Sequence, residues 1–197
     1  MARTYILKRR AEQQAETRRR IVEAAVELHG SVGPARTTIS MVAERAGVQR
    51  HTFYAHFPDE RSLLMACSGM ALERDPMPDA ASLKTVKDRR ERLRAGLGAL
   101  YHWYERNAET TACVLRDMQT HAPTREIAEL RYGPVMATYG EVLGAGLSAR
   151  QRALLRLALG FSTWRILVRE AGLNRSAAVA AMVQAVHGDE AKAPKTA

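Results

Sequence analysis

Five closely spaced side chains in the chain could bind a polyanion. Arg50, His51, Thr52, Tyr54 and His56 are hydrogen-bond donors, and no carboxylate interrupts them. Arginine can donate two parallel hydrogen bonds to guanine in the major groove, and hydroxyl and imidazole groups suit phosphate oxygens. The pattern indicates nucleic-acid binding, provided that one element presents these side chains together.

The stretch 38–57 predicts two short helices joined by a tight turn. Thr37 or Thr38 can cap the first helix, and Gly47 supplies the left-handed residue that often ends one. The second helix would bury one aromatic edge and expose the five donors. Apolar residues three or four positions apart define the buried faces of the two helices: Ile39, Val42, Ala43, Ala46, Phe53 and Phe57.

This ordered set resembles the helix-turn-helix of TetR-type transcriptional regulators. The resemblance covers residues 17–70 and is only architectural beyond them. It implies a DNA-binding domain followed by a helical ligand-binding and dimerisation domain. The resembling residues are Arg20-Ile21, Ala24-Ala25, Leu28, Gly33, Thr38-Ile39, Val42-Ala43, Ala46-Gly47-Val48, Thr52-Phe53-Tyr54, His56-Phe57 and Leu63-Leu64.

The expected DNA contacts divide into two kinds. Arg50 and His51 open the second helix and should reach base edges, while Gln49 could serve either kind of contact. The resemblance implies phosphate contacts for four further residues: Thr38, Thr52, Tyr54 and His56.

The chain departs from the TetR pattern at two positions. Glu60 stands where these proteins commonly have a phosphate-binding lysine, so either Arg61 replaces that contact or it is lost. His51 stands where a small residue is common, which would alter base preference.

The charge of the chain fits an acidic partner. Its formal net charge is +9. Residues 1–20 contribute seven basic side chains and two glutamates, hence 7 − 2 = +5. We expect a flexible basic arm over residues 1–14, either as a solvated tail or in contact with phosphate.

Nothing in the sequence predicts catalysis, a cofactor or a metal site. The six histidines and two cysteines do not form a metal-ligand pattern, and no nucleophile or phosphate-loop motif occurs. Two isolated cysteines favour a reducing compartment, and no apolar run of about 18 residues could span a membrane. We therefore expect a cytoplasmic protein that is not an enzyme.

The remaining sequence predicts an all-α fold. We place a DNA-binding domain with its connecting helix at 15–74, a ligand-binding and dimerisation domain at 75–188, and a disordered tail at 189–197. The prolines around residue 77 mark the boundary. Helices are expected over 14–31, 60–74, 83–107, 110–121, 124–143 with a kink or break at Gly133-Pro134, 148–171, and from Asn174 or Ser176 to 187.

The last two of these helices, about 149–187, are apolar on more than one side. A second covered side in so small a domain predicts a homodimer interface, in agreement with the resemblance. The alternative is burial within one subunit.

Aromatic and methionine side chains of the second domain could line a small-molecule pocket. Ordinary core packing explains the same residues equally well. The candidates are Tyr101, Tyr104, Met118, Tyr132, Met136, Tyr139, Phe161 and Trp164.

The sequence thus predicts a homodimeric DNA-binding regulator, a repressor released from a palindromic operator by a small molecule. Two alternatives remain within this class: a regulator without an effector, and an activator. A protein that merely shares a helical hairpin, as an enzyme or an interaction module, would show no sequence-selective DNA binding.

Overall fold

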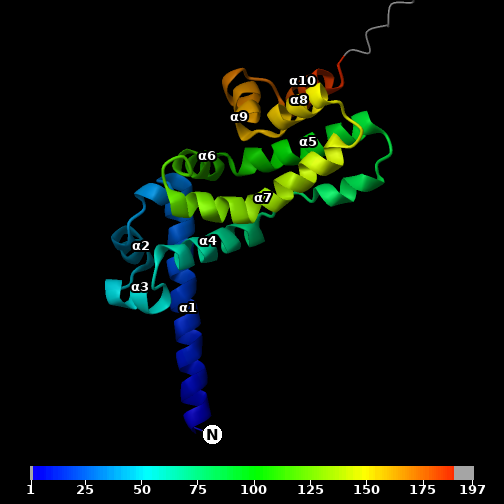
Figure 1. Cartoon of the computed structure of the whole chain (residues 1–197). Coiled ribbons are helices and arrows are strands. Elements are labelled where there is room, and N and C mark those ends of the chain that lie inside the picture. The colour runs from blue at the N-terminus through cyan, green and yellow to red at the C-terminus, as the bar shows by residue number, and fades with distance from the viewer. Residues whose placement is uncertain (1, 189–197) are drawn as a thin grey trace, which may run out of the picture. The chain divides into compact units, whose positions relative to one another are not determined.

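The computed structural model describes residues 2–188, and within that range all regular structure is helical (Figure 1), which confirms the predicted all-α class. The helices form two compact units. Unit 1 consists of the residues up to 76 together with 109–131, and unit 2 of residues 77–108 together with those from 132 onward. Within the described range, no helix is long and apolar enough to cross a membrane.

Unit 1 is built around its first helix, which packs against α2 and α4. Its core contains side chains from α1 to α4 and Ile127 of α7. Asp59 begins α4 by accepting a hydrogen bond from the Ser62 N–H at 2.7 Å. The elements are α1 (Ala2–Ser31), η1 (Pro34–Arg36), α2 (Ile39–Ala46), α3 (Arg50–His56), α4 (Glu60–Arg74), α6 (Ala108–Asp117) and the first part of α7 (Ala122–Gly144).

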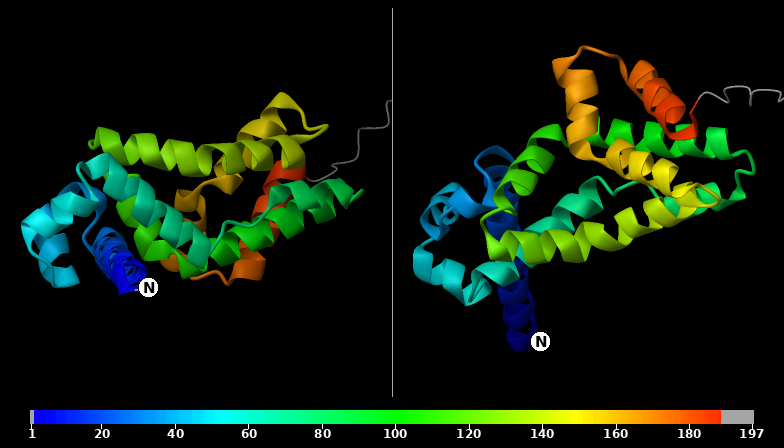
Figure 2. Two further views of the ribbon diagram at one scale, coloured as in Figure 1. Left: turned by 90° about the horizontal axis from the view of Figure 1, so that it is seen from below. Right: turned by 45° about the horizontal axis from the view of Figure 1, so that its top comes forward.

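Unit 2 packs α5 against α8, α9 and α10 (Figure 2). Asp88, Ser148 and Asn174 cap the starts of α5, α8 and α10, each by accepting from a main-chain N–H. Besides the rest of α7, its elements are η2 (Ala80–Thr85), α5 (Arg89–Arg106), α8 (Ala149–Leu159), α9 (Phe161–Trp164), the π-helical turn η3 (Arg165–Glu170) and α10 (Arg175–His187).

The arm expected over residues 1–14 is helical from Ala2, and residues 2–14 form the first turns of α1. Its flexibility stays a prediction. No glycine or proline precedes Gly30, and the segment is rich in alanine, arginine and glutamine, which are good helix formers. The basic charge is therefore carried by a helix. The predicted disordered tail at 189–197 lies outside the described residues.

Three other predicted helices differ in detail. The one expected over 83–107 starts only at Arg89. The one expected over 148–171 is interrupted at Gly160, whose ψ of 134° is extended and which separates α8 from α9. Conversely, α7 continues through Pro134 without the break that was allowed for there.

The boundary expected near residue 75 coincides with the first division between the units, after residue 76. Residues 109–131, however, belong to unit 1 and not to the later part of the chain. The assignment of functional domains to 15–74 and 75–188 stays a prediction.

Candidate nucleic-acid interface

Main-chain hydrogen bonds fix the turn between α2 and α3. Thr38 Oγ1 accepts from the Met41 N–H at 3.2 Å, so that Thr38 caps α2. Gly47 has φ 64° and ψ 41°, the left-handed conformation that is easiest without a Cβ. The Val48 N–H then donates to Ala43 O at 2.9 Å. These bonds set the direction in which α3 leaves α2.

α3 packs on the core of unit 1 through one aromatic edge. Phe53, and Phe57 directly after the helix, are each 1% exposed, and their ring centroids lie 5.9 Å apart. Arg50 and His51 are exposed, and Tyr54 is 45% exposed. A helix with one buried edge and no acidic residue thus presents a free surface of donors.

The other predicted contacts lie on the same two helices. Thr38 and Gln49 are exposed at the starts of α2 and α3. Thr52 and His56 are half-buried, and Thr52 Oγ1 lies 3.3 Å from His51 Nε2. The structure therefore brings together every predicted DNA contact between residues 38 and 56.

Arg61, the remaining predicted contact, already has an acidic partner. Its Nε donates to Glu126 Oε1 at 2.8 Å, and both side chains are more than half exposed. The neighbouring Glu60 carboxylate lies 3.4 Å from His121 Nε2. A phosphate bound at Arg61 would have to share its guanidinium with Glu126.

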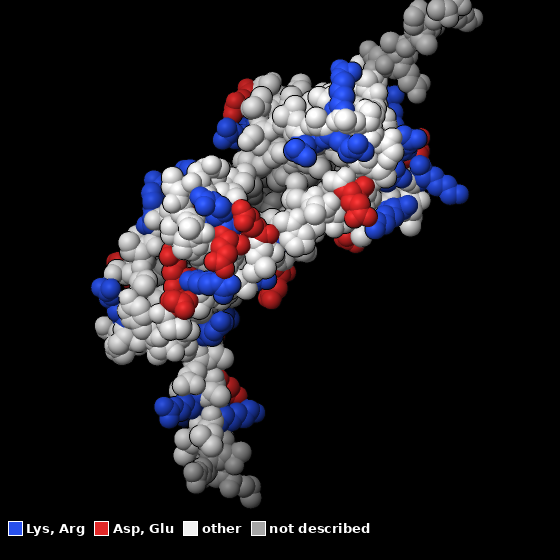
Figure 3. All heavy atoms as spheres, in the orientation of Figure 1, with Lys and Arg blue, Asp and Glu red and all other residues white. Residues whose placement is uncertain are grey.

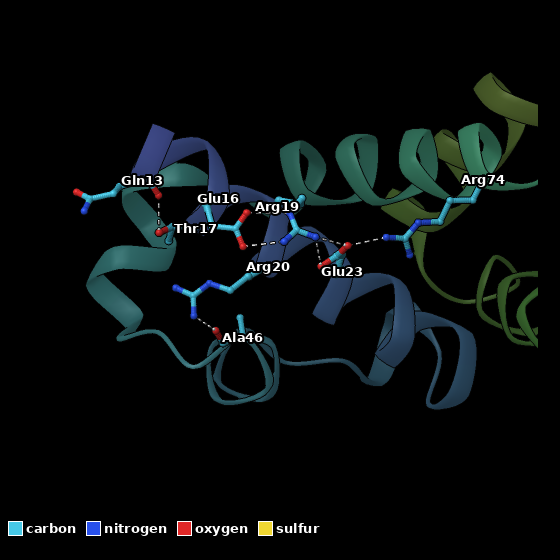
Figure 4. Close-up of polar contacts among 8 residues, drawn as sticks. All are labelled: Gln13, Glu16, Thr17, Arg19, Arg20, Glu23, Ala46 and Arg74. Atoms are coloured by element: carbon cyan, nitrogen blue, oxygen red, sulfur yellow. Dashed lines mark hydrogen bonds and ion pairs between the residues drawn. The ribbon is translucent and has the colours of Figure 1, made fainter. Parts of the chain in front are cut away.

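Two arginines of α1, Arg20 and Arg18, brace the helix-turn-helix, and Figure 4 shows the first of them. Arg20 Nη1 donates to Ala46 O, at the end of α2, at 3.3 Å. The Arg18 guanidinium lies 4.8 Å from the centre of the Phe57 ring, just after α3. The sequence indicated their charge but not these contacts.

A pair of side chains from α6 holds the loop that enters α2, a contact that no sequence pattern indicated. Asp117, at the end of α6, is 5% exposed, and its Oδ2 accepts from the Ala35 N–H at 2.9 Å. Its Oδ1 accepts from Arg116 Nε at 2.7 Å, while Arg116 Nη2 donates to Val32 O at 2.9 Å. Burial alone would raise the pKa of Asp117, but hydrogen bonds from Arg116 and Ala35 outweigh it and lower that pKa.

Gly33 makes room for this clamp. Its φ of 101° is rarely adopted by other residues, and a Cβ there would overlap the Arg116 guanidinium and the Asp117 carboxylate. The 82 positions between Ala35 and Asp117 explain why no local pattern revealed the contact.

A buried histidine and cysteine lie side by side in unit 1. His29 Nδ1 is 3.3 Å from Cys67 Sγ. Burial lowers the pKa of His29 to about 4 and raises the pKa of Cys67 to about 12. Both groups are therefore neutral near pH 7. In the described part of the chain, no three His, Cys, Asp or Glu side chains could hold a metal ion.

Most of the predicted ligand-lining residues form the core of unit 2. Tyr101 and Tyr104 donate to the main-chain oxygens of Ala158 and Leu159 at 2.9 and 2.8 Å. The rings pack in one cluster, with Tyr104 to Phe161 centroids at 5.3 Å. Five candidates are buried, namely Tyr101, Tyr104, Tyr139, Phe161 and Trp164, while Tyr132 is partly buried and its ring lies 6.2 Å from that of Trp103.

Unit 2 also contains a cavity of about 380 Å³ between α7 and α8. Of the eight candidates only Met136 lines it, and Met118 belongs to unit 1. Two arginines face an otherwise apolar wall. The lining residues are Met136, Gly140, Arg152, Leu155, Arg156, Leu159 and Gly160.

The sequence model of the family described as "Bacterial regulatory proteins, tetR family" matches residues 21–67. The match begins at Ile21, in the buried part of α1, and ends within α4. Residues 21–67 therefore belong to a TetR-family DNA-binding domain. This membership confirms the resemblance inferred from the helix-turn-helix residues.

Two curated relatives of this chain are regulators by name. HTH-type transcriptional regulator TtgR of Pseudomonas putida is 41% identical over 61 residues, 31% of this chain and 29% of the relative. HTH-type transcriptional repressor KstR of Mycolicibacterium smegmatis is 33% identical over 107 residues, 54% of this chain and 52% of the relative. The alignments thus span about half or less of these relatives.

Solved structures agree with the fold over most of the chain. The fatty acid degradation regulator FadR from Bacillus halodurans has a TM-score of 0.62 at 18% identity, covering 89% of this chain and 96% of that one. A transcriptional regulator from Saccharomonospora viridis, solved in complex with choline, has a TM-score of 0.58 at 19% identity, covering 89% and 97%.

Proposed function

We propose that the chain is a sequence-specific DNA-binding transcriptional regulator that places α3 in the major groove. The observation that carries the proposal is the exposed donor surface of α3, held on a buried Phe53 and Phe57 edge within a TetR-family domain. A helix of this kind fits the major groove with its first residues at base edges.

Arg50 and His51, at the start of α3, supply the base contacts. Tyr54 and the half-buried Thr52 and His56 bind phosphates beside them, and so does Thr38 from the start of α2. Gln49, next to Arg50, contributes to either kind of contact. Arg61 contributes less to phosphate binding, because its guanidinium is paired with Glu126.

Two subunits would read the two halves of a near-palindromic operator, about one helical turn or a multiple apart. The dimer forms through residues about 149–187. Support comes from two large apolar side chains on this segment: Leu157 is 58% exposed and Ile166 is 49% exposed. Apolar side chains left exposed on neighbouring helices suit a partner surface.

The regulator acts as a repressor that a small molecule releases. The cavity in unit 2 supports an effector with an apolar body and an anionic group, because Arg152 and Arg156 line it and no carboxylate does. Such a lining suits a fatty acid better than the cation choline, which is bound in the Saccharomonospora viridis structure. A fatty acid is in keeping with the named role of the Bacillus halodurans regulator.

The DNA-binding proposal is tested by two matched arginine variants. Arg50→Ala should reduce discrimination between a selected operator and a scrambled duplex by about 1–3 kcal/mol. Arg45→Ala removes the same charge from the neighbouring helix α2, where Arg45 is paired with Glu27 at 2.8 Å. It should leave the specificity ratio unchanged. An unchanged ratio for Arg50→Ala would refute the assignment of α3.

The effector proposal is tested separately by thermal unfolding with a long-chain carboxylate and the corresponding alcohol. The carboxylate should raise Tm more than the alcohol does, and Arg156→Gln should remove that difference. Equal shifts, or none, would favour a regulator without an anionic effector.

A further inference from the structure

The N-terminal half of α1 projects from unit 1 as a bare helix (Figure 1). Ile21 is the first buried residue of α1, whereas residues 5–16 are all exposed. Tyr5, Ile6 and Leu7 are 67%, 63% and 60% exposed. At about 1.5 Å per residue, residues 5–20 extend roughly 24 Å beyond the core.

The projecting helix leaves unit 1 beside the helix-turn-helix. Arg20 bonds to the end of α2 at Ala46, and Arg18 lies over Phe57 just after α3. Residues preceding Arg18 therefore continue past the level of the two DNA-contacting helices. The right view in Figure 2 shows the first turns of α1 extending clear of the other helices of unit 1.

One face of the projection is acidic and largely neutralised. Glu12, Glu16 and Glu23 recur at spacings of four and seven, which place them on one side of the helix. Arg19 binds Glu16 and Glu23 at 2.7 and 3.0 Å, and Arg74 binds Glu23 at 2.7 Å (Figure 4). The Glu16 and Glu23 carboxylates are thus held by cations of the same unit.

A second face of the projecting helix lies on the same side of α1 as its buried residues, but it is exposed to solvent. Leu7, Arg10, Gln14 and Thr17 precede Ile21 at alternating spacings of three and four, so they share its side. No carboxylate lies along this line. Among the described residues, Arg10 has no carboxylate partner within 4.0 Å. In the space-filling view, basic side chains flank the projection (Figure 3).

The composition of this face indicates its partner. A second protein helix packed along the same line would require apolar residues, but Arg10 and Gln14 are exposed polar donors. The Thr17 hydroxyl donates to Gln13 O of the same helix at 2.9 Å. A polyanion satisfies the Arg10 and Gln14 donors.

We propose that Arg10 and Gln14, on the face of α1 that also carries Leu7 and Thr17, bind the phosphate backbone of DNA flanking the bases read by α3. The proposal rests on the proposed DNA-binding function. By these phosphate contacts α1 increases the length of duplex that the protein contacts, without reading the base sequence there.

Two full-length variants remove the same charge from different faces. Arg10→Gln alters the proposed face, whereas Lys8→Gln alters the acidic one, because Lys8 lies four residues before Glu12. Both side chains are exposed. Affinity is measured between 50 and 200 mM salt on a selected duplex and on a scrambled one of equal length, each long enough to include the flanks.

Arg10→Gln should reduce the steepness of log affinity plotted against log salt concentration by about one. The ratio of wild-type to variant affinity should therefore fall about 3.5-fold from 50 to 200 mM salt, on both duplexes. Lys8→Gln should leave the slope unchanged. Equal effects of the two variants, or no effect of Arg10→Gln, would overturn the face assignment. Failure of the wild-type protein to distinguish the duplexes would overturn the proposed function instead.

Leu7→Asp provides a second test, since it places a carboxylate on the same face. It should weaken binding to both duplexes and leave the sedimentation coefficient unchanged. A change in oligomeric state would identify the face as a contact between copies of the chain and would overturn the phosphate assignment.

Discussion

Asp117→Asn should destabilise the protein even though it is nearly isosteric. The carboxylate is 5% exposed and accepts one hydrogen bond from the Ala35 N–H and one from Arg116. A hydrogen bond to a charged group contributes about 1.5–3 kcal/mol and a neutral one about 1 kcal/mol. Asparagine can still accept from Ala35, and Arg116 is half exposed. The net loss is therefore about 1–2 kcal/mol.

At this chain length, that loss lowers Tm by roughly 2–8 °C. Glu126→Gln is the matched control, because it makes the same chemical change in an exposed pair with Arg61 and should cost at most about 1 kcal/mol. Calorimetry at pH 7 measures both variants. Equal Tm values for Asp117→Asn and the wild type would show that the clamp does not stabilise the loop before α2.

The pH dependence provides a second check. The pKa of Asp117 is below its unfolded value of 3.8, so its stabilisation is fully present above about pH 4. The stabilisation is lost as the pH falls through the lower folded pKa. The difference between Asp117→Asn and the wild type should therefore shrink in strong acid. A difference that stays constant down to pH 2 would contradict the assigned shift.

Two further predictions concern stability. Gly33→Ala should lower the free energy of unfolding by at least about 1–3 kcal/mol in urea, because φ is 101° there, whereas Gly133→Ala in α7, with open space at its Cβ, should be neutral or stabilising. His29 has a pKa of about 4 in the folded chain and 6.5 in the unfolded one, so stability present above pH 6.5 should fall by about 2 kcal/mol between pH 7.5 and 5. His29→Gln should not show the part of this decrease that comes from protonation of His29. An equal decrease in the variant and the wild type would refute the low pKa assigned to His29.

Local signals predicted the helix-turn-helix accurately. The Thr38 cap, the Gly47 turn and the Phe53 and Phe57 edge depend on neighbours a few residues away, and each is present. The bounds of α4 were also predicted correctly, since Asp59 caps its start. Family membership follows from the same segment.

Contacts between distant residues were not predictable. Asp117 binds Ala35 across 82 positions, and Arg61 binds Glu126 across 65. A spacing pattern carries no information about such partners. The aromatic residues offered as ligand contacts were compatible with a pocket or a core, and in the structure most of them pack in the core of unit 2.

The extent of helix in the basic arm could not be predicted, for a different reason. Polar, basic residues are common in both solvated tails and exposed helices, and propensity distinguishes them weakly. The first turns of α1 have no apolar stripe beyond Tyr5, Ile6 and Leu7, so periodicity gave no helix signal. Their helical structure is nevertheless what gives the projecting face a defined direction.

The central claim is that α3 reads a DNA sequence. The most direct test selects bound sequences from a random duplex pool with the full-length protein, then titrates the enriched sequence and a scrambled control at several salt concentrations. If α3 reads sequence, a near-palindromic motif is enriched and the ratio of specific to non-specific affinity is large. Salt-sensitive binding with no enriched motif would contradict the claim, because only phosphate contacts would then be operating.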